Sequence, residues 1–216
     1  MRMGLRLLGV VKTRGWAKAA RFLVSRLARV QDDLVFAADP AQLARPFSRG
    51  GLRMLVLTKR NFQWALPRPV CERMFRGEGQ LYREAVREGD LGFVVLGPTD
   101  RLLHQSFVHF RVRTKQLIGE SDAVPLIAYC RTAWAWRGHG LFSETLGHIM
   151  AVLAVRGYRR ALVSCEASNE AAIRSIEHLG FRRIRRLRSL ILLNRWCWQR
   201  RSERSGEERR GFIALA

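Results

Sequence analysis

The segment from Val124 to Glu166 constrains the fold more than any other part of the chain. An apolar strand pattern over 124–132 is followed by a glycine-containing loop and a helical pattern with its apolar face at Phe142, Leu146, Ile149, Met150 and Leu153. Gly157 ends this helix, and the apolar run 161–166 predicts a further strand. Two strands joined by a helix favour a parallel crossover, because parallel strands need a long connection. The segment therefore predicts an α/β chain of the α+β type, with a mixed central sheet and flanking helices.

Other predicted elements flank this crossover on both sides. Strands are expected over 34–37, 52–58, 91–96 and 102–111, and the Gly-Pro-Thr-Asp sequence at 97–100 predicts a hairpin turn. A helix is expected over 80–88. A second helix begins after Asn169 and ends at Gly180, and the segment 181–194 can supply two more strands.

The charge balance is strongly positive. The chain has 39 Lys and Arg against 18 Asp and Glu, a formal net charge of +21. Such a field attracts anions, which include nucleic acid, anionic lipid and phosphate-rich cofactors. The alternative is that most of these arginines are only solvated. Residues 5–30 form a basic amphipathic helical pattern, which either packs on the domain or lies on an anionic membrane or nucleic acid.

The cysteines and the apolar runs point away from several classes of protein. The four cysteines form no C-x-x-C pair, so we expect no zinc or other metal site and a reduced environment. No apolar run approaches the roughly 20 residues of a membrane-spanning helix, and no signal-peptide cleavage site follows the basic start. We therefore expect a cytoplasmic protein, with peripheral association with a membrane left open.

A short motif carries the chemistry. Arg137-Gly138-His139-Gly140 lies between the predicted strand 124–132 and the following helix. A helix N-terminus presents unpaired N–H groups and a positive dipole end, glycines allow close approach, and arginine adds a fixed charge. Together they predict a cradle for a pyrophosphate group. A simple glycine turn is the alternative.

Two motifs together resemble a known family. The Arg137–Gly140 loop resembles the R/Q-x-x-G-x-G/A loop of the GNAT superfamily, the GCN5-related N-acetyltransferases. The segment from Asn169 to Phe181 is similar to that family's second motif, N-x-x-A-x-x-x-Y-x-x-x-G-F. The two motifs occur in the expected order with a strand between them. The resemblance covers about residues 91–190 and implies a GNAT domain over 31–197, a basic helical extension over 1–30 and a flexible charged tail over 198–216.

The resemblance implies an acyl-CoA-dependent N-acyltransferase that transfers acetyl from acetyl-CoA directly to an amine in a ternary complex. Acetyl-CoA would bind where the strands 124–132 and 161–166 splay apart, and no metal is implied. The implied cofactor-binding residues are Cys130, Arg131, Thr132, Arg137, Gly138, His139, Gly140, Leu141, Phe142, Ser143 and Asn169. The resemblance does not identify the amine acceptor or the oligomeric state.

Two departures from the family pattern bear on catalysis. Phe142 takes a position where the family usually has Gly or Ala, and Ile176 replaces the tyrosine that often protonates the leaving thiolate. Isoleucine cannot donate a proton, so the usual acid is missing. The remaining candidates for proton transfer are His104, His109, Tyr129, Glu166 and Ser175. Each of these candidates also has a purely structural interpretation. The alternative is therefore a non-catalytic module of the same fold that binds CoA, nucleic acid or a membrane.

Overall fold

The computed structural model describes residues 28–74, 79–111, 118–193, 196–203, 206 and 208–214, which divide into two compact units. The larger unit comprises residues 34–184, and the smaller one comprises 28–33 and the described residues from 185 onward. Two strands, β1 (Ala28–Ala38) and β7 (Arg182–Leu192), run along the chain from one unit into the other. Of the predicted N-terminal helix, residues 5–27 lie outside the described residues, and 28–30 begin β1.

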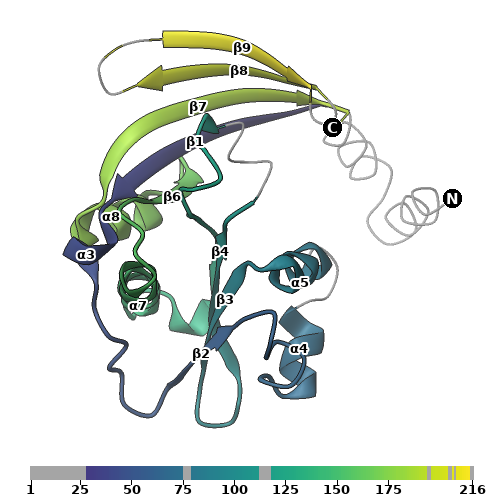
Figure 1. Ribbon diagram of the computed structural model, residues 1–216, viewed down its shortest axis with the longest axis vertical. Helices are drawn as coiled ribbons and strands as arrows, with labels where there is room; N and C mark the ends of the chain where they lie inside the picture. The colour runs from purple at the N-terminus through teal and green to yellow at the C-terminus, as the bar shows by residue number, and fades with distance from the viewer. Residues whose placement is uncertain are drawn as a thin grey trace, which may run out of the picture. The chain divides into compact units, whose positions relative to one another are not determined.

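The larger unit contains a mixed sheet. Its antiparallel part follows the order β2 (Arg53–Leu57), β3 (Leu91–Leu96), β4 (Leu102–His109) and β5 (Leu126–Thr132) (Figure 1). The next strand, β6 (Ala161–Glu166), pairs with β5 in parallel. The predicted parallel crossover within a mixed sheet is therefore confirmed.

Helices cover both faces of this sheet (Figure 1). On one face, α7 (Leu141–Val155) and α8 (Glu170–Leu179) bury their apolar sides against Phe93 and Ile127. On the other, α4 (Arg68–Met74) and α5 (Gly79–Glu88) pack on Phe107. The 15-residue α7 is the helix that links β5 to β6, and a short 3-10 helix, η1 (Trp134–Trp136), precedes it.

Sequence reasoning missed two helices, α4 and α3 (Pro40–Leu43). The start of α3 carries a recognisable signal, since the Asp39 side chain accepts a hydrogen bond from the Ala41 N–H and proline is the first helical residue. After α3, the Arg45 N–H donates to the Gly147 carbonyl of α7 at 3.1 Å. This hydrogen bond holds the loop that precedes β2 beside α7.

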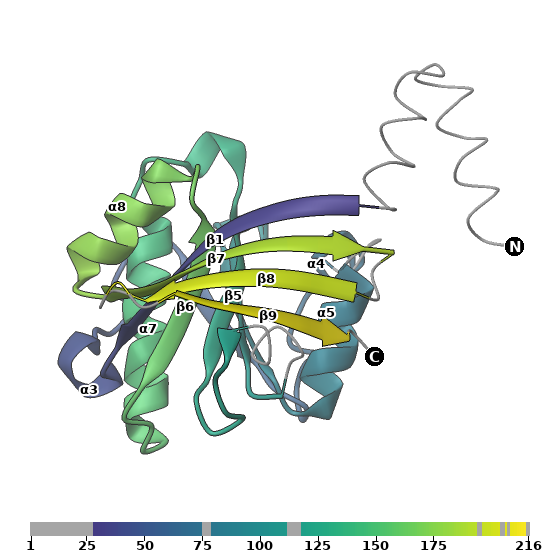
Figure 2. The ribbon, with the colours of Figure 1, turned by 90° about the horizontal axis from the view of Figure 1, so that it is seen from above.

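In the smaller unit, β1 lies next to β7, which pairs antiparallel with β8 (Trp196–Glu203), and β8 with β9 (Glu208–Ala214) (Figure 2). The prediction of a flexible tail over 198–216 is wrong where β8 and β9 form. Alternation of buried Cys197 and Gln199 with exposed Trp196 and Trp198 gives β8 a period of two, and its cross-strand partners stabilise it despite its charge. The segment 181–194 supplies one long strand rather than two. Among the described residues, none of the helices has the length and hydropathy needed to cross a bilayer.

Candidate functional site

The site begins where β5 and β6 separate. Their parallel register joins Leu126 to Leu162 and Ile127 to Val163, and within the described residues the pairing stops there. Both strands continue, β5 to Thr132 and β6 to Glu166. Over this stretch the β6-facing edge of β5 has backbone groups outside the sheet ladder, which an extended ligand can bind by hydrogen bonds. The predicted pair of splayed parallel strands is therefore confirmed.

A bulge in β5 begins two residues after Ile127, the last residue paired with β6. On the β4 side, Phe107 faces Ala128 and Gln105 faces Arg131, so two residues of β5, Tyr129 and Cys130, oppose Ser106 alone. Tyr129 has a left-handed backbone with φ of 53°. That conformation costs a non-glycine residue about 1 kcal/mol, so the surroundings must hold it in place. The bulge turns the strand at the point where the gap opens.

The predicted phosphate cradle lies between β5 and α7. Gly138 and Gly140 both have φ of +77°, and residues 137–140 are exposed. Gly140 is the N-cap of α7 and provides no side-chain cap, whereas Asn169 caps α8 by accepting from the Ala172 N–H. The N–H groups of the first turn of α7 therefore have no side-chain cap, an arrangement that favours an anion.

The side chains of Arg137 and His139 in this loop contact residues that precede the helix start. The Arg137 guanidinium lies 4.7 Å from the Trp134 ring centroid, which fixes it beside the loop. His139 Nδ1 lies 2.9 Å from the Arg137 carbonyl oxygen. Leu141 is buried, so it can offer a ligand only its backbone, whereas Phe142 is half-buried and packs against the main core. The Phe142 ring centroid lies 6.1 Å from that of His104.

Arg49 lies beside the predicted cradle, and sequence reasoning missed it. A Cβ placed on Gly140 would lie 3.6 Å from an Arg49 Nη, and the Arg49 guanidinium binds the Glu144 carboxylate at 2.9 Å. It reaches α7 from the loop before β2, some 90 residues away in sequence. No local pattern marks it, because only the packing of this loop along α7 brings it to the helix start.

An aromatic cluster lies on the face covered by α4 and α5. The Tyr82 ring of α5 stacks on Tyr129, with centroids 3.8 Å apart, and lies 5.7 Å from His109. His109 is buried, and its Nδ1 is 2.5 Å from Asp90 Oδ2. Asp90 also accepts from the Phe110 N–H. Tyr82 thus brings two predicted candidates, Tyr129 and His109, into one cluster, and it was not itself predicted.

A second polar group lies on the α7 face of the sheet. His104 Nδ1 is 2.7 Å from Thr132 Oγ1, and its Nε2 is 2.8 Å from Ser106 Oγ. Burial lowers the pKa of His104 to about 4, so its imidazole is neutral near pH 7. Burial likewise raises the pKa of the Cys130 thiol to about 12, which keeps it protonated. The neutral ring and the protonated thiol suit a fixed hydrogen-bond network rather than a nucleophile.

The other candidates lie elsewhere. Glu166 is exposed at the end of β6, and the Ser175 hydroxyl donates to the Ala171 carbonyl one turn earlier in α8. Arg131 is exposed on β5. Ile176, where the family pattern has tyrosine, is 0% exposed within the main core. Within the described part of the chain, no group of three or more His, Cys, Asp or Glu side chains is arranged to hold a metal ion.

Comparison with known proteins identifies the fold. No protein-family model and none of the curated proteins matches the chain. Among solved structures, the chain is similar to one described as an acetyltransferase from the GNAT family of Novosphingobium aromaticivorans, with 22% identity over 75% of this chain and 63% of that one, and a TM-score of 0.51. It is also similar to a tandem GNAT protein from the clavulanic acid biosynthesis pathway, with 16% identity over 79% of this chain and 55% of that one, and a TM-score of 0.50. The chain has the GNAT fold and spans about three fifths of the length of these structures.

Proposed function

We propose that the chain is an acyl-CoA-dependent N-acyltransferase that transfers acetyl from acetyl-CoA to an amine, directly and within a ternary complex. One observation carries this proposal. The separation of β5 from β6 after Ile127 is followed by a bulge and then by an uncapped, glycine-flanked start of α7. These features provide, in order along one strand and loop, sites for an extended polar chain and for a pyrophosphate. Every acyl-CoA contains both parts, whichever acyl group it carries.

In this proposal the backbone of β5 binds the pantetheine arm through residues Cys130 to Thr132. The first-turn N–H groups of α7 bind the pyrophosphate, because a helix start without a side-chain cap favours a negative charge. Arg137 and Arg49 supply positive charge there, and the bidentate geometry of a guanidinium suits phosphate oxygens. Arg49 also neutralises Glu144, whose carboxylate would otherwise repel the ligand.

We propose His109 as the proton acceptor on the opposite face. Bound acetyl-CoA supplies an acetyl group activated as a thioester. The Asp90 carboxylate accepts a hydrogen bond from Nδ1–H of His109, which leaves the Nε2 lone pair free to take the proton that the amine loses as its C–N bond forms. Tyr129 and Tyr82 form a wall beside this histidine, and water protonates the departing thiolate.

A non-catalytic CoA-binding module is the second candidate, and two observations favour it. Ile176 is fully buried, and the neighbouring Ser175 hydroxyl donates its hydrogen bond to the Ala171 carbonyl. The part of α8 that carries the proton donor in the family pattern therefore offers none. This candidate predicts the same acetyl-CoA affinity without turnover.

A matched pair of glycine variants tests the cradle. Gly140 and Gly157 lie at opposite ends of α7 with φ of +77° and +81°, so a side chain is equally strained at either position. Gly140→Asp places a carboxylate where the pyrophosphate would lie, and we expect acetyl-CoA binding at least about tenfold weaker by isothermal titration calorimetry. Gly157→Asp should bind as the wild type does. If the two variants bind acetyl-CoA with equal affinity, this loop does not bind the pyrophosphate.

Turnover separates the enzyme from the binding module. Release of CoA thiol is measured with panels of amino sugars, peptide N-termini, lysine peptides and acidic amines, since a basic surface steers acidic substrates. His109→Asn should lower kcat by about 100-fold and leave acetyl-CoA affinity unchanged, because loss of a general base affects only proton transfer. Tight acetyl-CoA binding with no acceptor-dependent thiol release would establish the binding module instead.

A further inference from the structure

One face of the β7–β8–β9 sheet in the smaller unit exposes large apolar side chains. We call this set the aromatic patch. Trp198 and Phe212 are directly opposite each other on β8 and β9 and are 62% and 63% exposed. Leu190 is opposite Trp198 and Leu192 is opposite Trp196, so the patch spans three strands. Its members are Leu190, Leu192, Trp196, Trp198 and Phe212, each at least 38% exposed. A contiguous apolar surface of this kind, as opposed to scattered single residues, indicates an interaction site.

A row of arginines borders the aromatic patch. Two residues along each strand from Leu190, Trp198 and Phe212 are Arg188, Arg200 and Arg210, and they are cross-strand neighbours, Arg188 with Arg200 and Arg200 with Arg210. We call these three the arginine row. Side chains two apart in a strand share a face, so the row and the patch lie on the same side of the sheet.

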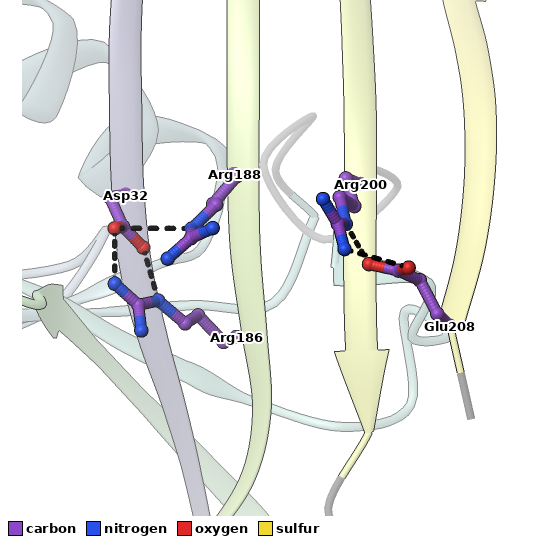
Figure 3. Close-up of polar contacts among 5 residues, drawn as sticks. All are labelled: Asp32, Arg186, Arg188, Arg200 and Glu208. Atoms are coloured by element: carbon purple, nitrogen blue, oxygen red, sulfur yellow. Dashed lines mark hydrogen bonds and ion pairs between the residues drawn. The ribbon is translucent and has the colours of Figure 1, made fainter. Parts of the chain in front are cut away.

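The arginine row is only partly neutralised (Figure 3). Asp32 of β1 binds Arg186 at 2.5 and 2.7 Å and Arg188 at 3.5 Å, and the Arg186 hydrogen bond is the main cause that lowers the pKa of Asp32. Glu208 accepts from Arg200 at 2.8 Å. Within the part of the chain that the structure describes, no carboxylate pairs with Arg210. Three guanidinium groups, those of Arg186, Arg188 and Arg200, thus share two carboxylates, and Arg210 pairs with neither of them.

This excess of charge points to an anionic partner. Like charges directly opposite each other on neighbouring strands destabilise a sheet, and these arginines occupy three strands in register. An anionic ligand lying across the arginine row would remove the repulsion. The partner must therefore present anionic groups next to an apolar region, since the arginine row and the aromatic patch are adjacent.

We propose that this face docks onto the surface of an anionic phospholipid bilayer. Tryptophan and phenylalanine side chains enter the boundary between headgroups and acyl chains, and the arginines bind the lipid phosphates beside them. This docking is independent of the proposed acyl transfer. It uses the smaller unit, whereas the acyl-transfer residues lie in the larger one.

The side chains of the patch favour lipid over single-stranded nucleic acid. Bases bind to open aromatic faces, and Trp196 already stacks on Phe212 with centroids 5.3 Å apart. Leu190 and Leu192 provide aliphatic surface, which acyl chains bind and bases do not stack on. A bilayer uses the whole patch, while a nucleic acid strand would leave most of it unmatched.

Vesicle co-sedimentation of the full chain tests this proposal. Vesicles of phosphatidylcholine alone are compared with vesicles that contain roughly one third phosphatidylglycerol, and we expect binding only to the latter at low salt. Trp198→Ser and Phe212→Ser should each weaken binding about tenfold, because each removes a large apolar side chain from the interface. Arg210→Glu should weaken it by a similar factor and reduce its dependence on salt.

Two matched controls come from the larger unit. Trp64 is 75% exposed there and Arg101 is exposed on the β3–β4 turn, so Trp64→Ser and Arg101→Glu make the same chemical changes away from the patch. Both should bind anionic vesicles as the wild type does. Thermal unfolding of every variant shows whether the fold is retained, which we expect since the substituted side chains are exposed.

Other occupants of the face give different results, and each would overturn the proposal. No binding of the wild type to anionic vesicles would do so directly. Equal binding by the wild type and the Trp198 and Arg210 variants would place the membrane contact elsewhere on the chain. Two outcomes apply if the wild type does not bind vesicles. If Trp198→Ser abolishes binding to a single-stranded oligonucleotide, the face binds nucleic acid. If the same variant abolishes a dimer in analytical ultracentrifugation, the face binds a second copy of the chain.

Discussion

The buried histidine beside the gap makes the stability of the protein depend on pH. Both ring nitrogens of His104 are hydrogen-bonded, and burial lowers its pKa from 6.5 to about 4. The unfolded chain therefore binds more protons than the folded one between these two values. The contribution of His104 to the free energy of unfolding is fully present above pH 6.5 and decreases as the pH falls towards 4. The decrease is about 2.5 kcal/mol at pH 4.5 and at most about 3 kcal/mol.

Urea unfolding of the wild type and His104→Gln at pH 7 and pH 4.5 measures this contribution. Carboxylates titrate in both proteins, so the difference between them isolates His104. The wild type should lose about 2.5 kcal/mol more than the variant on acidification. If both proteins lose the same free energy of unfolding, His104 is not buried as a neutral ring, and the network with Thr132 and Ser106 does not form as described.

Three further substitutions probe the cradle and the core. Arg49→Ala should weaken acetyl-CoA binding about tenfold in calorimetry, because it removes a cation and frees the Glu144 carboxylate beside the helix start; unchanged affinity would place Arg49 outside the cradle. Ile176→Tyr should not increase thiol release and should cost about 1–3 kcal/mol in urea unfolding, because it overpacks a fully buried position; a gain in turnover would show that this side chain reaches the gap. Gly180→Ala should cost about 1 kcal/mol or more in the same assay, since an alanine is strained at a φ of +108° and its Cβ would also displace Leu43 Cδ2, 2.9 Å away; a neutral effect would contradict this backbone conformation.

Local signals predicted much of the larger unit. The period of the apolar residues predicted α7, α8 and the strands around them, because a helix or strand that packs on one face repeats its apolar residues at that spacing. Gly180 ends α8 with a left-handed φ, as its position predicted. The charged composition of 198–216 was misleading, since β8 and β9 depend on hydrogen bonds to neighbouring strands that composition does not report.

The sequence by itself determined a crossover of strand, glycine loop and helix, and with it the order in which the proposed CoA-binding groups follow one another. These are short-range properties, set by side-chain period, glycine and helix ends. Only the tertiary structure decided where the gap opens, because the register of β5 against β6 and the bulge at Tyr129 depend on pairing between distant strands. The same holds for Arg49 at the helix start and for the full burial of Ile176, since both follow from how separate segments pack.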